Sequence, residues 1–209
     1  MALTFLQILT EVAASEGKTW DATAAGGTSD SSEEFLRYQY VQHVNAALRW
    51  VWMEHDPEFA WPWTVDDKTT TPTSGLITAS TLSDTGDGSW CSLWTSDPRT
   101  ENSTAVPVSA TADHDGVHVL DGTASVFAFY RKAVPQGTWS AGASYSTPST
   151  IPDQLRQPIV FKSCSLRLAA LGQYDEADKR ESHAVDWMNG RKAGLRNSGL
   201  IWESNILTF

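Results

Sequence analysis

Apolar residues recur at helical spacing along SSEEFLRYQYVQHVNAALRWVWMEHD, which predicts a long helix over about residues 32 to 56. Serines followed by Glu33 and Glu34 favour a helix start, because hydroxyls cap free N–H groups and acids suit the positive helix end. Pro57 disfavours the helical conformation in the residue before it, so we expect the helix to end near Asp56. The apolar stripe consists of Phe35, Tyr38, Val41, Val44, Leu48, Val51 and Trp52. We expect this helix to be the central scaffold of the helical part.

Four of the ten tryptophans fall within fourteen residues at the end of this helix: Trp50, Trp52, Trp61 and Trp63. Such a stripe is usually part of a core, because large aromatic side chains contribute much buried apolar surface. The alternative is an exposed aromatic ledge for a partner or a sugar.

Helical spacing also appears at the N-terminus. Leu3, Leu6, Leu9, Val12 and Ala13 form a stripe, with Thr4 as a plausible cap and Gly17 as the end. Polar residues interrupt the apolar run and a basic n-region is lacking, so we expect a first helix rather than an export signal.

Two more helices are predicted after residue 150. Pro152 fits a first turn, and Pro158 implies an irregular turn before the main helix. Gly172 is a natural helix stop. A second helix from about Tyr174 to Arg191 has acidic residues early and basic residues late, as the helix dipole favours. The first of these helices has an apolar stripe of Val160, Cys164, Leu168 and Leu171.

Between the helices, residues 64–131 consist of short β-type runs separated by turn signals. The run at Ser125–Arg131 is apolar on both faces, so we expect a central strand, and the neighbouring GVHVLDG is its expected hairpin partner. The other candidate strands are Thr64–Val65, Gly75–Ala79, Trp90–Trp94, Ala105–Ala110 and Val117–Leu120.

The predicted fold is therefore α+β, an antiparallel bundle of about four helices with an inserted small antiparallel β-sheet domain and an extended C-terminal tail. The tail is rich in apolar residues but too short for its own core, so it needs a docking place. The expected parts are N-terminal bundle helices at 1–62, an inserted β-rich domain at 63–134, a linker at 135–150, a helical hairpin at 151–192 and the docking tail at 193–209.

Composition narrows the function. The chain has 209 residues, 41% of them apolar, with a formal net charge of −10. This is a globular composition, and its acidity argues against a phosphate-gripping surface. Cys91 and Cys164 lack metal-site spacing, so we expect buried thiols rather than a disulfide framework. No stretch has the length of a transmembrane segment.

Candidate chemistry is sparse. His114 and His118 flank Asp115 but would lie about 13 Å apart on a strand, so a surface turn is favoured over a metal site. Neither a nucleophile elbow nor a phosphate-binding loop is present. We expect no catalytic, cofactor-binding or metal-binding residues, and no enzyme.

Two aromatic pairs fit a sugar-stacking face, although packing within a small sheet is the commoner use of such residues: Trp90 with Trp94, and Trp139 with Tyr145.

The order of these pieces resembles the head–tail connector proteins of tailed bacteriophages, also called adaptor or head-completion proteins. The similarity lies in the long helix FLRYQYVQHVNAALRWVW with its Asn45–Ala46 pair, and in the Trp-rich exit WPWTV. It continues through YRKAVP at Tyr130–Pro135 and is best in IPDQLRQPIVFKSCSLRLAALGQYDEA at Ile151–Ala177. The β insert is longer here than in the smallest members of the family.

The resemblance implies a virion structural protein at the neck, assembled in the host cytoplasm as a homo-oligomeric, typically dodecameric ring. Its partners would be the portal protein and a tail or tail-completion (nozzle) protein, with DNA passing through without tight binding and no membrane involved. The residues expected to dock on the portal or a neighbour are Arg196, Leu200, Ile201, Trp202, Ile206, Leu207 and Phe209. The alternative function is a Trp-rich carbohydrate-binding or host-recognition β module.

Overall fold

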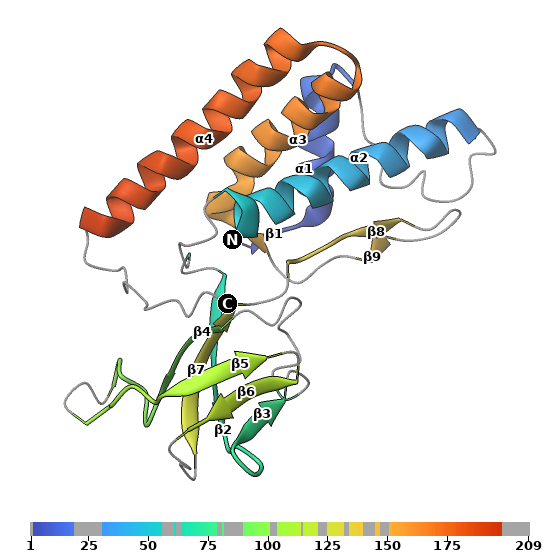
Figure 1. Ribbon diagram of the computed structural model, residues 1–209. Coiled ribbons are helices and arrows are strands. Elements are labelled where there is room, and N and C mark those ends of the chain that lie inside the picture. Colours follow the sequence, from blue (N-terminus) through green and yellow to red (C-terminus); the bar gives the residue numbers. More distant parts are fainter. Residues whose placement is uncertain are drawn as a thin grey trace. The chain divides into compact units, whose positions relative to one another are not determined.

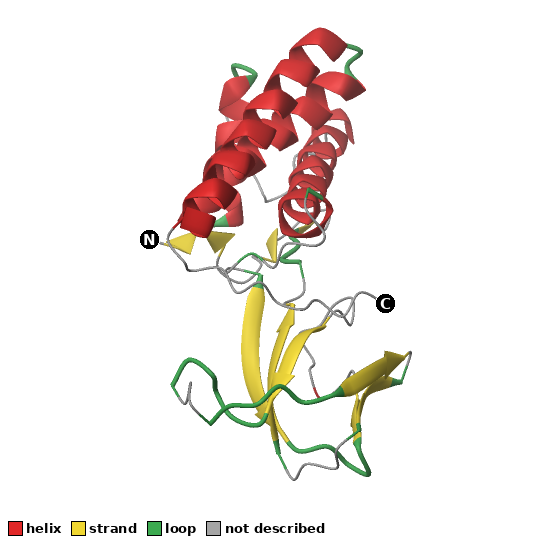
Figure 2. Cartoon of the chain, turned by 60° about the vertical axis from the view of Figure 1, so that its left-hand side comes forward, coloured by secondary structure: helices red, strands yellow, loops and turns green. Residues whose placement is uncertain are grey.

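The protein is a mixed α+β protein whose chain divides into two compact units (Figures 1 and 2). Unit 1 comprises Met1–Asp56 and Val134–Leu200, and unit 2 comprises Pro57–Ala133 with Ile201–Phe209. The computed structural model describes residues 2–18, 31–55, 61, 64–78, 81, 90–100, 104–113, 115–120, 125–131, 134–139, 145–146 and 151–197.

The N-terminal helix of unit 1, α1 (Phe5–Ser15), begins at the predicted cap. The Thr4 hydroxyl accepts from the Gln7 N–H at 3.2 Å, and the Thr4 N–H donates to Gln7 Oε1 at 2.9 Å. This reciprocal pair is a capping box, which satisfies two free N–H groups at the helix start. The buried face of α1 consists of Phe5, Ile8, Leu9, Val12 and Ala13.

The second helix, α2 (Ser31–Arg49), continues as a π-helix, η2 (Trp50–Glu54). The His55 N–H donates to the Trp50 carbonyl at 2.9 Å, five residues back. Tyr38, predicted on the apolar stripe, is 48% exposed, and Tyr40 is buried in its place. Trp52 and Trp61 are also buried, which fits a core role, and Trp63 lies outside the described residues. The other buried apolar residues of this stretch are Val41, Val44, Ala47, Leu48 and Val51.

Helix α3 (Arg156–Ala170) follows a single 3₁₀ turn, η4 (Asp153–Leu155), which is the irregular opening that Pro158 predicted. The helix ends at Gly172, whose φ is 77°. The Gly172 N–H donates to the Ala169 carbonyl and the Gln173 N–H to the Leu168 carbonyl, which together form a Schellman motif.

The last helix, α4 (Tyr174–Asn197), is longer than predicted. Residues 193–197 are helical and do not belong to the extended tail that we expected from 193 onward. Ala193, Leu195 and Arg196 are strong helix formers, which offsets the weak propensity of Gly190 and Gly194.

Among the described helices, α3 rather than α2 makes the most extensive contacts with the others, since it packs on α1, α2 and α4 (Figure 1). Its buried face differs from the predicted stripe, because Val160 and Leu168 are only half-buried and Leu171 is 53% exposed. The buried residues of α3 are instead Pro158, Ile159, Lys162, Ser163, Cys164, Ser165 and Arg167. Two of these are charged, and charged side chains are seldom buried unless they are paired.

Residues 135–150, which we expected to form a linker, contain ordered structure that belongs to unit 1. Strand β8 (Thr138–Trp139) pairs antiparallel with β9 (Tyr145–Ser146). Just before β8, Gly137 is buried and hydrogen-bonded to Asn45 of α2. A second two-stranded sheet joins β1 (Ala2–Leu3) to β10 (Ile151–Pro152), which places the start of the chain beside the entry to η4.

Unit 2 contains two antiparallel three-stranded sheets. In the first sheet, β7 lies between β2 and β4, as its two apolar faces predicted. In the second sheet, β6 lies between β3 and β5. The predicted hairpin of β6 with β7 is therefore wrong, because each strand is the centre of a different sheet. The strands are β2 (Val65–Thr70), β3 (Leu76–Thr78), β4 (Trp90–Trp94), β5 (Ala110–Asp113), β6 (Gly116–Val119) and β7 (Val126–Arg131).

Successive side chains of β7 point to opposite faces of the sheet, and each face contributes to a different apolar cluster. Val126, Ala128 and Tyr130 pack with residues of the second sheet, in a cluster that also contains Ile77, Leu93, Val117 and Val119. The opposite side chains, Phe127 and Phe129, form a smaller cluster with the half-buried Val65 and Trp94. Gly116 permits the close approach of β6 to β3, because a Cβ there would lie 2.2 Å from the Ile77 carbonyl oxygen.

Candidate functional site

The predicted docking residues of the tail lie at or beyond the end of α4. Arg196 belongs to the backbone of α4, but its side chain lies outside the described residues. The other six also lie outside them: Leu200, Ile201, Trp202, Ile206, Leu207 and Phe209.

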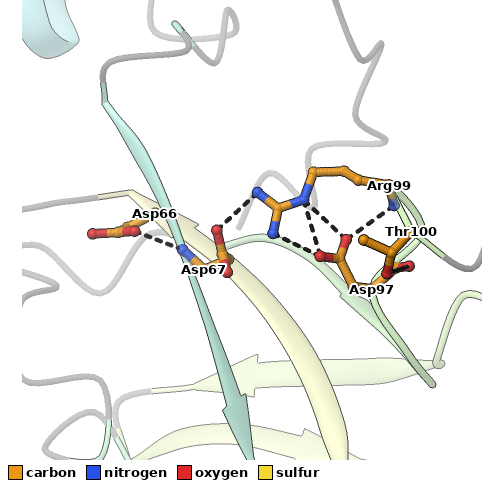
Figure 3. A network of polar contacts seen from close by, with 5 residues as sticks. All are labelled: Asp66, Asp67, Asp97, Arg99 and Thr100. Carbon is orange, nitrogen blue, oxygen red and sulfur yellow. Dashed lines mark hydrogen bonds and ion pairs between the residues drawn. The ribbon is translucent and has the colours of Figure 1, made fainter.

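In unit 2, the side chain of Arg99, in the turn after β4, binds two aspartates (Figure 3). Its Nε donates to Asp97 Oδ1 at 2.9 Å and Nη2 donates to Asp97 Oδ2 at 2.8 Å. Nη1 donates to Asp67 Oδ1 on β2, also at 2.9 Å. The Arg99 guanidinium therefore stabilises the turn that contains Asp97 and also connects this turn to β2, 32 residues away in the sequence.

The backbone of the turn explains this orientation. The Arg99 N–H donates to Asp97 Oδ1 at 2.9 Å, and the Thr100 N–H donates to the Asp97 carbonyl at 3.2 Å. Asp is favoured at such positions because its side chain can accept from the backbone two residues on. The hydrogen bonds from Arg99 lower the pKa of Asp97, and those to Asp97 and Asp67 raise the pKa of Arg99. Both partners therefore stay charged at neutral pH.

Arg99 also covers the smaller aromatic cluster of unit 2. Its guanidinium carbon lies 5.4 Å from the ring centre of Phe127 and 5.3 Å from that of Phe129. These distances are typical of cation–π contacts. Because two carboxylates already neutralise the guanidinium, the arrangement suits the fixing of a surface turn better than the capture of an anion. The sequence showed only a turn signal here, since the partner Asp67 lies on another strand.

The charge of the chain is concentrated in unit 2. Residues 57–133 contain ten acidic and four basic side chains, which gives −6 of the formal −10. Such an excess of negative charge repels phosphates and favours cationic partners.

Unit 1 contains a second polar cluster, which is buried where α1, α2 and α3 meet. Tyr40 donates its hydroxyl hydrogen to Glu16 Oε2 at 2.5 Å. Arg167 Nη1 donates to Gln39 Oε1 at 2.7 Å, and Arg167 Nε lies 3.4 Å from Glu16 Oε1. The Arg167 guanidinium also lies over the Tyr40 ring at 5.2 Å. This cluster could not be predicted from the sequence, because its members come from α2, α3 and the end of α1.

This setting alters the titration of the nearby groups. Burial raises the pKa of Tyr40, and its hydrogen bond to Glu16 adds to the rise. Burial lowers the pKa of His43, and the positive charge of Arg167 lowers it further. His43 is therefore neutral at pH 7.

A third polar pair connects α3 to α4. Lys162 is buried, and its Nζ donates to Glu181 Oε1 at 2.5 Å. The same ammonium lies 5.1 Å from the ring centre of Trp50. Glu181 is 43% exposed, so the lysine is the desolvated partner of the pair.

The other predicted candidates are only partly described. Trp94 is half-buried in the Phe127–Phe129 cluster, and its Nε1 donates to Ser92. The Trp90, Trp139 and Tyr145 side chains lie outside the described residues, as does His114. Asp115 is exposed in the turn before β6, and His118 is half-buried on β6.

The buried Cys164 is a free thiol that lies 3.0 Å from the Ser15 hydroxyl, and burial raises its pKa. The Cys91 side chain is not described.

Within the described ranges, no three His, Cys, Asp or Glu side chains gather closely enough to hold a metal ion. None of the helices described is both long and apolar enough to cross a membrane.

No model of a known protein family matches the chain, and no curated protein matches it significantly. The candidate functions therefore depend on the features of the chain itself.

Proposed function

We propose that this protein is a head–tail adaptor of a tailed-phage virion, which binds under the portal as a homo-oligomeric, dodecameric ring. In this role it extends the DNA channel and joins the capsid to the tail. The four helices then form an antiparallel bundle with the β unit as its insert, and the residues after α4 form the extended docking tail.

The observation that carries the proposal is the connector-like segment Ile151–Ala177. It forms one continuous piece of unit 1, consisting of β10, the 3₁₀ turn η4, helix α3, the Gly172 stop and the first turn of α4. The Asn45–Ala46 pair of the same resemblance also has a defined place, because Asn45 binds the backbone of Gly137.

The acidic charge of unit 2 supports the same role. Ten acidic and four basic side chains in residues 57–133 disfavour binding to a phosphate backbone. A channel component needs this property, because DNA must slide past it without being held.

The docking tail supplies the contact with the portal or with a neighbouring subunit. Its apolar residues, among them Trp202 and Phe209, are of the kind that dominate binding energy when they are buried in a partner.

The test is ring formation and portal binding by the purified full-length chain. Negative-stain microscopy should show rings, alone or on the cognate portal, and deletion of residues 198–209 should abolish portal binding. This deletion begins after Asn197, so it leaves α4 complete. A Tyr174→Ala variant is the matched control, because Tyr174 is 66% exposed but lies at the other end of α4. A chain that stays monomeric with portal, or a truncated chain that still supports full virion assembly, contradicts the proposal.

The second candidate, a carbohydrate-binding or host-recognition β module, gains support from the partly accessible Trp94, which packs on the Phe127–Phe129 cluster. Binding to a glycan array that is lost on changing Trp90 or Trp139 would favour this module over the adaptor.

A further inference from the structure

Three buried polar atoms of unit 1 have no hydrogen-bond partner among the described residues: Glu16 Oε1, His43 Nδ1 and Arg167 Nε. They come from the end of α1, from α2 and from α3. Buried polar atoms in folded proteins nearly always have a partner, which is either another protein group or an ordered water molecule. Three such atoms in one cluster therefore need a common explanation.

Direct contact does not satisfy them. Arg167 Nε lies 3.4 Å from Glu16 Oε1, which is an ion-pair distance but is long for a hydrogen bond. Each of these two side chains is also held at its other atoms, since Glu16 Oε2 accepts from Tyr40 and Arg167 Nη1 donates to Gln39. These two hydrogen bonds restrain both side chains, so Arg167 Nε and Glu16 Oε1 are not free to move closer together.

His43 follows Gln39 by four residues and Tyr40 by three on α2, so it shares a helix face with the two side chains that Arg167 contacts. The charge of Arg167 lowers the pKa of His43, and the charge of Glu16 raises it, although burial is the largest effect. Lys18 is the other cation at this end of α1, 3.6 Å from Glu16 Oε2.

We propose that Glu16, His43 and Arg167 together bind one internal water molecule. The water oxygen accepts from Arg167 Nε, and one water hydrogen is donated to Glu16 Oε1. The remaining hydrogen or lone pair meets His43 Nδ1, so either neutral tautomer of the imidazole is satisfied. This arrangement gives the water three hydrogen bonds, about the usual number for internal waters.

The water site joins α2, α3 and the end of α1 through atoms that do not hydrogen-bond one another directly. Arg167 is only 5% exposed, so a water held there is shielded from bulk solvent and exchanges slowly. The site is independent of the adaptor proposal, because it lies within unit 1 of a single chain.

A high-resolution crystal structure of the unaltered protein near pH 7.5 is the direct test. We expect a water within about 3.2 Å of all three atoms, which is the usual hydrogen-bond range. A direct hydrogen bond between Arg167 Nε and Glu16 Oε1, with no water density between the three side chains, overturns the proposal.

A double-mutant cycle tests the same site in solution. His43→Phe keeps an aromatic ring but removes Nδ1, and Glu16→Gln removes the charge on the other partner. If one water couples them, their effects on the unfolding equilibrium constant differ from additivity by about threefold or more. His183→Phe is the matched control, because His183 packs on Phe161 at the α3–α4 contact and should be additive with Glu16→Gln. Additivity of His43→Phe with Glu16→Gln overturns the proposal.

Discussion

Asn45 and Gly137, which are 92 residues apart in the sequence, exchange two hydrogen bonds in unit 1. Asn45 Nδ2 donates to the Gly137 carbonyl at 2.7 Å, and the Gly137 N–H donates to Asn45 Oδ1 at 2.8 Å. The side chain of Asn45 thus pairs with Gly137 as a neighbouring strand would, and it fixes the segment before β8 against α2.

Asn45→Ala should destabilise unit 1 by about 2 kcal/mol, because each lost hydrogen bond contributes about 1 kcal/mol. Urea unfolding followed by far-UV circular dichroism measures the change. Gln42→Ala is the control, since Gln42 is exposed on the same helix and its replacement should have little effect. Equal losses for the two variants would show that the Gly137 contact contributes nothing.

Gly137→Ala should destabilise unit 1 by about 1–3 kcal/mol, the usual range for overpacking a core. A Cβ at this position would lie 2.5 Å from two ring carbons of Phe5, which is itself only 2% exposed. Gly190→Ala should instead stabilise the protein by about 0.5–1 kcal/mol, because α4 has open space there and alanine favours helix. Thermal unfolding of both variants measures whether each substitution raises or lowers stability. A stabilising Gly137→Ala would rule out the close packing against Phe5.

The Lys162–Glu181 pair should respond differently to the loss of each partner. Glu181→Gln leaves a buried ammonium without its carboxylate and should cost about 2 kcal/mol, less than for a fully buried pair. Lys162→Met leaves only the 43%-exposed Glu181, which water can solvate, and should cost less than about 1 kcal/mol. Unfolding free energies of the two variants provide the comparison. The reverse order would contradict the assignment of Lys162 as the desolvated partner.

Acidification should weaken unit 1 through His43. Its folded-state pKa is below the ordinary value of about 6.5, so the unfolded chain binds a proton more readily. The contribution of His43 to stability is therefore complete above about pH 6.5 and is lost as the pH falls through the folded-state pKa.

The expected readout is the difference between unfolding free energies at pH 7.5 and pH 5.0. In His43→Phe this difference should be smaller than in the unaltered protein, because the group that titrates in this range has been removed. His183→Phe should keep the original pH dependence, since His183 is exposed on α4. An unchanged difference in His43→Phe would place the acid sensitivity elsewhere.

Local signals in the sequence predicted the elements well. The cap at Thr4, the irregular turn before α3 and the stop at Gly172 each depend on residues within a few positions, so spacing alone identified them. The central position of β7 followed from its two apolar faces.

Features that depend on distant partners could not be predicted in this way. The pairing of β6 was misassigned because short strands of similar composition do not specify their neighbours. The buried face of α3 was misjudged because Lys162 and Arg167 are neutralised by Glu181 on α4 and by Glu16 just after α1. Arg99 was missed for the same reason, since its second carboxylate is on β2.

The π-helical turn at Trp50–Glu54 has a consequence for how this chain tolerates length changes. A π-turn accommodates one more residue than an α-turn, so η2 stores a single surplus residue at the end of α2. About five residues of π-helix and about four of α-helix each complete roughly one turn, so deleting one residue within η2 would restore regular helix and leave the direction of the following residues nearly unchanged. A deletion within the regular part of α2 would instead rotate the residues after it by about 100° relative to those before it.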